Sequence, residues 1–346
     1  MYLVCAMCNL LIWKGCFQMS RVSLNDIAEA LNISKSSVSR ALRNKPGVNS
    51  RLREEIFKMA QDLNYPFKLP KDREFNRVAI IIPDFSNPFF ATVYYGIQSV
   101  FRANGYLAYA VSTDEDSELE EDYVNFFARE EVQGFIVAPT RNAEKIYRDL
   151  DSPPIVFFDR HPDSLNVQSV LVDNKDIMFQ VLRYLVEVGH RNICFVSGDE
   201  LLYTGRLRTA GFLEALDIFG LDRDKCPVIP GNFKEPEAYE ATKNALQRHK
   251  VTAVIASSNK TTLGILRALR DLDLQIPEDV SVIGFDDQEW MEFNTPPITT
   301  IVQPAFTMGT LAASLLMQQI QGNSSPESVV LKAEIKHRQS VRPISR

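Results

Sequence analysis

The chain has 346 residues, and 45% of them are hydrophobic, which is enough to fill ordinary cores in two or three domains. Its net charge of −6, if evenly spread, would argue against nucleic acid as a partner. The charge is uneven: residues 19–77 hold 12 Lys and Arg against 7 Asp and Glu, whereas residues 78–346 hold 25 against 37. A small basic N-terminal segment can bind DNA phosphates, while the larger acidic remainder of the chain repels DNA.

Residues 1–18 are apolar but have no basic start and no small-residue cleavage site, so they do not read as a signal peptide. They are also too short to span a bilayer. We interpret them as an extension that precedes the true start at Met19. Cys5 and Cys8 form an isolated Cys-X-X-Cys, and without a second ligand pair this spacing predicts no metal site. An odd cysteine count without a secretory context indicates reduced thiols in the cytoplasm.

Three short amphipathic helices are predicted in residues 22–63. Apolar residues recur at i, i+3, i+4 and i+7 from Leu24, and Ser23 can cap this first helix. After the turn Asn-Ile-Ser (32–34), a second helix runs to Leu42, and a third follows from Asn49 to about residue 63. Two helices joined by so short a turn predict a helix-turn-helix.

The second helix has two faces that differ in chemistry. At about 100° per residue, Val38, Ala41 and Leu42 share one side. The other side carries the polar residues Lys35, Ser36, Ser39 and Arg40. Arg can pair with guanine in the major groove, Lys and Ser can read base edges, and hydroxyls at a helix N-terminus suit phosphate oxygens. We therefore favour a DNA-reading helix over an amphipathic hairpin that belongs to a larger core.

Residues 66–77 contain two prolines and alternating charges, which predict a linker. Beyond it, short apolar runs alternate with amphipathic helices, a pattern typical of α/β folds with parallel sheets. The predicted strands are 78–82, 107–111, 134–138, 155–158, 170–172, 193–196, 253–256 and 280–285. The predicted helices are 89–104, 119–130, 177–188, 208–219, 237–249, 261–272 and 306–320. About 270 residues favour two lobes over one, with a ligand between them at the carboxyl ends of the strands.

Polar and aromatic residues follow several of these strands. Asp-Phe-Ser-Asn-Pro-Phe-Phe (84–90), Asp-Arg (159–160) and Asp-Asp (286–287) come at three strand ends. Carboxylates accept hydrogen bonds from sugar hydroxyls, guanidinium groups donate, and aromatic faces cover the apolar side of a sugar ring. Each residue alone could be a cap, a turn or core, but together they favour a polyhydroxylated ligand.

Catalysis finds little support in the sequence. It contains no nucleophile elbow, no phosphate-binding loop of the Walker type and no His-Glu-X-X-His motif. The four histidines are scattered, and His190, which follows Gly189 at a predicted helix end, is expected to cap that helix or to complement its dipole. Binding is therefore favoured over an enzymatic reaction.

Residues 22–44, with Val48 and Leu-Asn-Tyr (63–65), resemble the DNA-binding headpiece of the LacI/GalR family of bacterial transcription regulators. Further motifs extend the resemblance to residue 342: Ser-Asn-Pro-Phe-Phe (86–90), Phe-Phe-Asp-Arg (157–160), Gly-His-Arg-Asn-Ile (189–193), Arg-X-X-Gly-Phe (208–212), Ile-Pro-Glu-Asp-Val-Ser-Val-Ile-Gly-Phe-Asp-Asp (276–287) and Pro-Pro-Ile-Thr-Thr-Ile-Val-Gln-Pro (296–304). The resemblance implies a helix-turn-helix domain at 19–65 and a type I periplasmic-binding-protein-like domain at 78–343 that binds the effector and dimerises. Its N-lobe is expected at about 78–172 and 305–332, and its C-lobe at about 173–304 and 333–343.

The resemblance also implies which residues bind DNA and effector. Lys35, Ser36 and Arg40 match positions that read bases, whereas Ser34, Ser37 and Asn49 match positions that contact phosphates. The implied effector residues are Phe89, Phe90, Asp159, Arg208, Phe233, Ser258, Asn259, Asp286 and Gln303. The implied partners are a pseudo-palindromic operator in double-stranded DNA, a carbohydrate-derived effector and a second copy of the chain, with no cofactor. A sugar-binding module for transport or sensing without DNA binding is the alternative.

The sequence departs from the family at two places. Ser258 replaces the usual Asn, and Lys260 adds a charge near the predicted cleft, which makes an anionic ligand such as a sugar phosphate or sugar acid a candidate. The linker is shorter than the family's hinge segment and contains Pro70, which leaves Leu69 as the sole candidate for a minor-groove wedge.

Overall fold

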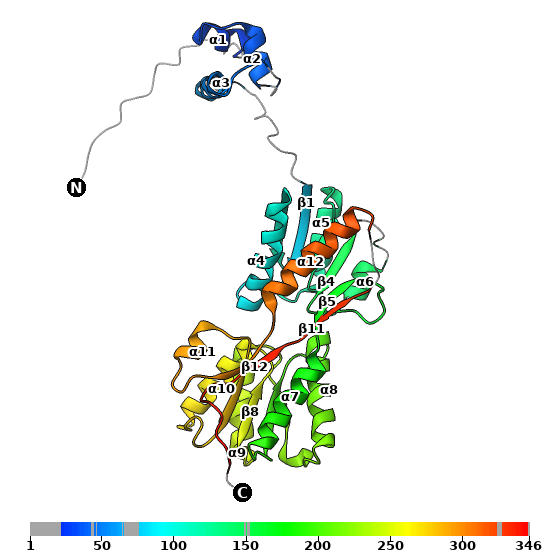
Figure 1. Cartoon of the computed structure of the whole chain (residues 1–346), viewed down its shortest axis with the longest axis vertical. Coiled ribbons are helices and arrows are strands. Elements are labelled where there is room, and N and C mark those ends of the chain that lie inside the picture. Colours follow the sequence, from blue (N-terminus) through cyan, green and yellow to red (C-terminus); the bar gives the residue numbers. More distant parts are fainter. Residues whose placement is uncertain are drawn as a thin grey trace, which may run out of the picture. The chain divides into compact units, whose positions relative to one another are not determined.

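The computed structural model describes residues 22–42, 45, 47–63, 65, 76–148, 150, 153–323 and 327–344. These residues belong to two compact units, Met1–Glu74 and Phe75–Arg346. The expected extension at 1–18 and most of the linker, including Leu69 and Pro70, lie outside the described residues. Figure 1 labels the elements of both units. Within the part of the chain that is described, no helix is both long and apolar enough to cross a membrane.

The first unit is a bundle of three helices, as predicted: α1 Leu24–Ala30, α2 Lys35–Leu42 and α3 Ser50–Asp62. Its core contains the fully buried side chains of Ile27, Val38, Ala41 and Ile56. Asp26 accepts a hydrogen bond of 2.7 Å from the Ser23 backbone N–H, which closes the N-terminus of α1. The turn between α1 and α2 needs a positive φ, and Asn32 supplies it at 52°.

The N-lobe of the second unit contains one parallel sheet in the order β11-β5-β4-β3-β1-β2. Its strands are β1 Asn76–Ile82, β2 Tyr106–Ser112, β3 Phe135–Val137, β4 Ile155–Phe158, β5 Ser169–Val172 and β11 Val329–Leu331. Its helices are α4 Pro88–Ala103, α5 Ser117–Arg129, α6 Ala143–Tyr147 and α12 Ala305–Ile320. A Cβ atom on Gly309 would lie 2.0 Å from the Val93 carbonyl oxygen, so only glycine lets α12 pack this closely on α4.

The C-lobe contains a second sheet in the order β12-β10-β9-β8-β6-β7. Its strands are β6 Ile193–Ser197, β7 Val228–Pro230, β8 Ala253–Ala256, β9 Ser281–Phe285, β10 Thr299–Val302 and β12 Glu334–Lys336. Its helices are α7 Asn174–Glu187, α8 Tyr203–Ile218, α9 Glu235–Arg248, α10 Asn259–Asp271 and α11 Glu289–Phe293, with a 3₁₀ turn at Arg223–Lys225. Only β12 runs antiparallel to its neighbour in this sheet.

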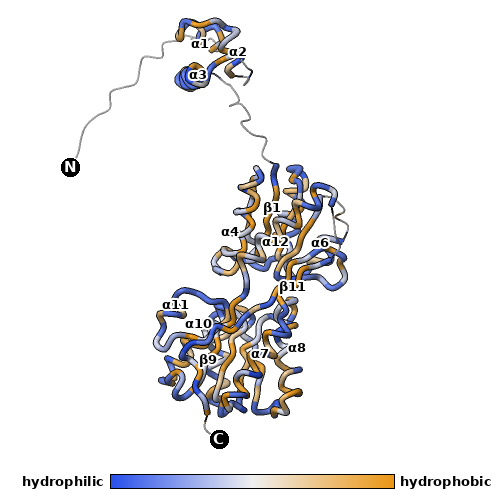
Figure 2. The backbone as a smooth tube through the Cα atoms, in the orientation of Figure 1, coloured by the Kyte–Doolittle hydropathy of each residue, from blue (hydrophilic) through white to orange (hydrophobic). Residues whose placement is uncertain are grey.

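The chain crosses between the lobes three times: from β5 to α7, from β10 to α12 and from β11 to β12 (Figure 1). Hydrophobic stretches follow the inner strands of both lobes (Figure 2). The fully buried residues Ile80, Ile82, Val254 and Ile283 are part of this interior. These crossings bring the carboxyl ends of the two sheets together, which is where α/β folds bind ligands.

The predicted α/β class with two parallel sheets is confirmed, but several short elements were missed. β7, β10, β11 and β12 have only three or four residues each, and α6 and α11 have five. Such short runs are too brief to show a period. The linker was expected to end at Arg77, whereas β1 already begins at Asn76.

The expectation that His190 caps a helix is wrong. Its ring is buried between Thr252, whose Oγ1 lies 2.9 Å from Nδ1, and the Arg342 carbonyl oxygen, 3.2 Å from Nε2. Burial lowers the pKa of His190 to about 4, so the ring is neutral at pH 7. Arg191 binds the helix end instead, because its guanidinium donates to the Val186 carbonyl oxygen at 2.9 Å.

Candidate functional site

The outer face of α2 carries the residues expected to read bases. Lys35, Ser36 and Arg40 are exposed, whereas Val38 and Ala41 are fully buried on the other side. The Arg40 guanidinium lies along the helix and donates to the Ser36 carbonyl oxygen at 3.2 Å. This contact is exposed and its acceptor is an uncharged carbonyl, so Arg40 can exchange it for a bidentate pair with a base edge.

Two of the residues expected to contact phosphates have a structural role in this unit. The Ser34 hydroxyl accepts from the Ser37 backbone N–H at 3.1 Å, and Asn49 Oδ1 accepts from the Leu52 N–H at 2.8 Å. Ser34 and Asn49 therefore cap α2 and α3. The Ser34 hydroxyl also lies 2.8 Å from the hydroxyls of Ser36 and Ser37. The hydroxyls expected to contact DNA phosphates are therefore clustered at the N-terminus of α2.

Arg53 is an important residue that sequence reasoning missed. Its guanidinium donates to the carbonyl oxygens of Ala41 at 3.1 Å, Lys45 at 3.0 Å and Val48 at 3.4 Å. It thus ties the C-terminus of α2 and the following loop to α3. No local pattern distinguishes Arg53 from the other charged residues of α3, because its partners are set by the tertiary fold.

A cleft of about 550 Å³ lies between the two lobes of the second unit. Eight of the nine expected effector residues line it: Phe89, Phe90, Asp159, Arg208, Phe233, Ser258, Asp286 and Gln303. The ninth, Asn259, lies against it and donates from Nδ2 to Asp286 Oδ2 at 3.2 Å. Both lobes contribute, because Phe89, Phe90 and Asp159 belong to the N-lobe and the others follow the C-lobe strands and hinge.

Arg208, on α8, is the centre of the C-lobe wall and is only 4% exposed. Its Nε donates to Asn174 Oδ1 at 2.6 Å, Nη1 to the Ser257 carbonyl oxygen at 2.6 Å and Nη2 to Gln303 Oε1 at 3.1 Å. The guanidinium carbon lies 4.0 Å from the centre of the Phe285 ring. Two N–H groups of the guanidinium remain for a ligand.

The Asp286 carboxylate is held by amides on both sides. Gln303 Nε2 donates to Oδ1 at 2.8 Å, and Asn259 donates to Oδ2. Burial raises the pKa of Asp286 to about 6, and the hydrogen bond from Gln303 and the charge of Arg208 oppose this rise. Asp286 is therefore an acceptor whose charge changes near neutral pH.

The Asp159 carboxylate faces the same cleft from the N-lobe. It is buried, and its nearest cation is Arg160, whose Nε lies 3.6 Å from Oδ2. Among the described residues it accepts no hydrogen bond within the usual distance limits. Burial raises its pKa, with the charges of Arg160 and Arg208 acting in the opposite direction. A buried carboxylate whose nearest donor, Arg160, lies 3.6 Å away is weakly satisfied, so Asp159 is suited to accept from a ligand.

Three aromatic side chains complete the walls. Phe89 and Phe90 lie edge to face, with ring centres 5.2 Å apart, where α4 begins. Phe233 lies in a loop with a φ of 58°, and its ring centre is 5.9 Å from the Arg208 guanidinium carbon. These rings provide the apolar surface that the pattern predicted.

Ser258 and Lys260, the residues that depart from the family pattern at the cleft, have clear structural roles. The Ser258 hydroxyl accepts from the Thr261 N–H at 3.2 Å and caps α10, so it is occupied. The Lys260 ammonium forms an ion pair with Asp84 of the opposite lobe. Because Lys260 already has a carboxylate partner, it no longer argues for an anionic ligand.

Several residues of the cleft were not predicted. Asn87 accepts from Asn259 Nδ2 at 2.7 Å, and Arg141 pairs with Asp199 at 2.8 Å, both between lobes. Asn87 stands within the Ser-Asn-Pro motif, which was a usable signal. The pairing of Arg141 with Asp199 joins residues 58 positions apart, and nothing local indicates it.

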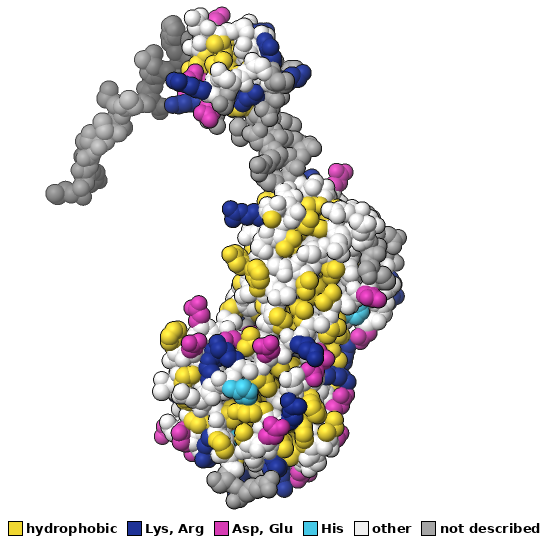
Figure 3. Space-filling model, viewed as in Figure 1, with side chains coloured by type: hydrophobic (Ala, Val, Ile, Leu, Met, Phe, Trp, Pro, Cys, Tyr) yellow, Lys and Arg dark blue, Asp and Glu magenta, His cyan; other side chains and the backbone are white. Residues whose placement is uncertain are grey.

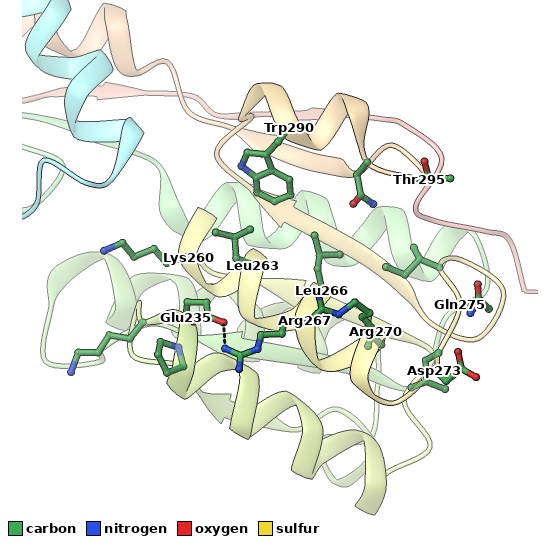
Figure 4. A pocket seen from close by; sticks show the side chains of 16 residues that line it. Glu235, Lys260, Leu263, Leu266, Arg267, Arg270, Asp273, Gln275, Trp290 and Thr295 are labelled. Carbon is green, nitrogen blue, oxygen red and sulfur yellow. Dashed lines mark hydrogen bonds and ion pairs between the residues drawn. The ribbon is translucent and has the colours of Figure 1, made fainter.

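A second hollow, of about 1040 Å³, runs along the outside of the C-lobe. We call it the α10 groove. Figure 4 shows Leu263, Leu266 and Trp290 along it, and the ion pair between Arg267 and Glu235 at its edge. The groove is larger than the cleft but has no buried, unpaired acceptor, so the cleft is the better small-molecule site.

Comparisons with known proteins found matches to both units of the chain. Residues 23–66 match a family model described as bacterial regulatory proteins, lacI family, and residues 182–341 match a periplasmic binding protein-like domain. The HTH-type transcriptional repressor CytR of Escherichia coli (strain K12) is 29% identical over 319 residues, 88% of this chain and 92% of that protein.

Solved structures are similar over most of their length. The transcriptional regulator CelR–cellobiose complex has a TM-score of 0.71 and 27% identity, and the match covers 92% of this chain and 100% of that one. A LacI family transcriptional regulator from Enterococcus faecium with bound ribose has a TM-score of 0.70 and 27% identity, over 78% and 100% of the two chains.

Replacing Arg40 tests the α2 surface. Arg40→Ala is expected to weaken binding to a DNA site, selected from random sequences with the wild-type protein, by about 1–3 kcal/mol, because a bidentate base contact is lost. Lys58→Ala removes the same charge from an exposed position on α3 and is the matched control. Titration at two salt concentrations should show lost sequence discrimination for Arg40→Ala alone. Equal effects of both variants on specific and random DNA would contradict base reading by Arg40.

The pKa of Asp286 predicts how ligand binding depends on pH. A ligand hydroxyl that donates to Asp286 favours the ionised carboxylate, so affinity should fall about tenfold from pH 7 to pH 5. Without ligand the free energy of unfolding should fall as pH rises from 3.8 to about 6, because the folded state holds this proton more tightly. Asp286→Asn should flatten both profiles in calorimetry and urea unfolding. A wild-type affinity that is constant over this range would show that the ligand does not bind Asp286.

Proposed function

Because the chain belongs to the LacI family of bacterial regulatory proteins, we propose that it represses transcription from a specific operator under the control of a carbohydrate bound between its lobes. The observation that carries this proposal is the combination of a DNA-reading surface on α2 with the cleft around Asp159, Arg208 and Asp286. A sugar-binding module without DNA binding does not account for the exposed cationic face of α2.

The chemistry of the cleft favours an uncharged carbohydrate of one or two rings. Asp159 and Asp286 accept from hydroxyl groups, and the remaining N–H groups of Arg208 donate to ring or hydroxyl oxygens. Phe89 and Phe90 offer apolar surface from one lobe and Phe233 from the other. The structures named above hold ribose and cellobiose, and such ligands fit the size class of a 550 Å³ cleft.

Binding of the carbohydrate is coupled to the arrangement of the lobes. The ligand contacts Asp159 of the N-lobe and Asp286 of the C-lobe, so it has more contacts when the lobes are close. Differential affinity for the closed arrangement shifts the population toward it. The three crossings between the lobes allow such a rotation without breaking either sheet.

We further propose that two copies of the chain form a homodimer, which matches a pseudo-palindromic operator. Large apolar side chains are exposed on both lobes: Tyr95, Leu107, Tyr109 and Phe306 on the N-lobe, and Leu263 and Phe293 on the C-lobe. Tyr95 and Phe306 pack together with ring centres 5.9 Å apart, and hydrophobic side chains gather over α4 and α12 (Figure 3). Exposed apolar surface of this kind marks an interface.

The dimer proposal predicts a specific effect of Leu263→Asp, which places a charge in the α10 groove. Analytical ultracentrifugation should show a shift from dimer to monomer, since a buried unpaired charge opposes association. Ile218→Asp, at a side chain that is 66% exposed on α8, is the control and should stay dimeric. If Leu263→Asp remains a dimer at the same concentration, the groove is not part of the interface.

The effector proposal predicts that sugars stabilise the protein. At about 100 times the dissociation constant, ribose or cellobiose should raise the unfolding midpoint by roughly 5–10 °C. Asp159→Asn should lower the affinity of the responding sugar by about 10- to 100-fold, because a hydrogen bond to a charged acceptor is lost. Asp114→Asn is matched in chemistry and in positive φ but lies exposed at the rim, and it should bind normally. Equal binding by all three proteins would place the sugar elsewhere.

A further inference from the structure

The lobes are joined at the edge of the cleft by two neighbouring contacts. Asn259 and Lys260 begin α10 in the C-lobe, whereas Asp84 and Asn87 lie in the loop that leads into α4 of the N-lobe. Lys260 pairs with Asp84, and Asn259 donates to Asn87 at 2.7 Å. The side chains of Lys260 and Asp84 are 34% and 25% exposed, so this pair lies between the cleft and the solvent.

Electrostatics make Asp84 the natural partner of Lys260. A lysine in the first turn of α10 faces the positive end of the helix dipole, which disfavours its charge. Asp84 offsets this from the opposite lobe, and its own position is fixed by the Ser86 N–H at 2.7 Å. Burial disfavours ionisation of Asp84, but the hydrogen bonds from Lys260 and Ser86 outweigh it and hold its pKa below the ordinary value.

The other cations that line the cleft also have partners. Glu115 accepts from both terminal nitrogens of Arg160, at 2.6 and 2.8 Å. Asp199 pairs with Arg141, and Glu237 pairs with Lys234 at 3.1 Å. Arg208 is held by the neutral groups described above. Among the described residues of the cleft, only Arg208 forms no ion pair, and its side chain is buried in the C-lobe wall, so an anionic group at the mouth of the cleft meets no unpaired cation.

We propose that Asp84 and Lys260 form a charge gate at the mouth of the cleft that accepts uncharged sugars and rejects sugars with a phosphate or carboxylate group there. The gate rests on the proposed effector site. An uncharged sugar leaves the pair intact and lets the lobes close over it. An anionic group has to take Lys260 from Asp84, and it then leaves Asp84 next to the ligand without a counter-ion. Such an unpaired like charge is a means of rejecting the wrong partner.

The experiment removes each member of the gate separately. Asp84→Asn keeps the shape of the side chain but releases Lys260, Lys260→Met removes the cation alone, and the double variant removes both charges. Asp114→Asn removes a carboxylate from the rim that pairs with no cation among the described residues, so it controls for net charge. Calorimetry with D-ribose and D-ribose 5-phosphate measures selectivity, and unfolding midpoints with inorganic phosphate, against sodium chloride of equal ionic strength, measure anion access without any sugar.

The gate predicts that the wild type prefers ribose over ribose 5-phosphate by at least about tenfold. Asp84→Asn should bind the phosphorylated sugar with about tenfold or more higher affinity than the wild type, and inorganic phosphate should raise its unfolding midpoint. The double variant and Asp114→Asn should show neither effect. If the wild type prefers the phosphorylated sugar and Lys260→Met loses it, Lys260 is a phosphate ligand and the gate is wrong. The gate is also wrong if Asp84→Asn gains neither response. If no sugar binds any variant but Asp84→Asn alone gains the phosphate response, the gate stands and the effector proposal fails.

Discussion

The buried charge of Arg208 is the constraint on which the cleft depends. A guanidinium that is almost wholly removed from water is tolerated only when its donors and its charge are matched. Asn174, the Ser257 carbonyl and Gln303 match the donors, and the acidic pair Asp159 and Asp286 matches the charge. These partners come from α7, from the turns after β8 and β9, from the segment after β10 and from the opposite lobe, so Arg208 interacts with five separate segments.

The same network separates anchoring groups from recognition groups. Gln303 is held between Arg208 and Asp286, and Asp286 is held between Gln303 and Asn259, so these side chains keep their orientation before a ligand arrives. Binding then orders few groups, which limits its entropic cost. Asp159 is held less tightly, because its contact with the Arg160 guanidinium, at 3.6 Å, is longer than an ordinary hydrogen bond.

The sequence predicted the buried strands and the residues at their ends, because apolar runs and strand-end acids are local patterns. It could not predict contacts that depend on how elements meet. His190 carried a helix-end signature but lies buried against Thr252, and Arg53 had no signature at all. Lys260 shows the limit most clearly. Its position near the cleft was predictable, but its partner Asp84 lies 176 residues away in the sequence. Because Asp84 pairs with Lys260, the lysine no longer argues for an anionic ligand.

Asp159 and Asp286 also share a local structure. β4 and β9 occupy corresponding places in the two sheets, each ends in a Phe, and each is followed by an Asp with a φ near 60° (62° and 60°). The two halves of the cleft therefore contain the same strand-end turn, in which a Phe ends the strand and an Asp with positive φ follows it. The two turns differ in their contacts, because Asp286 accepts from the amides of Gln303 and Asn259, whereas Asp159 has only the longer contact with Arg160. A ligand that contacts both carboxylates therefore meets the same local backbone geometry on its two sides, with a firmly held acceptor on one side and a loosely held one on the other.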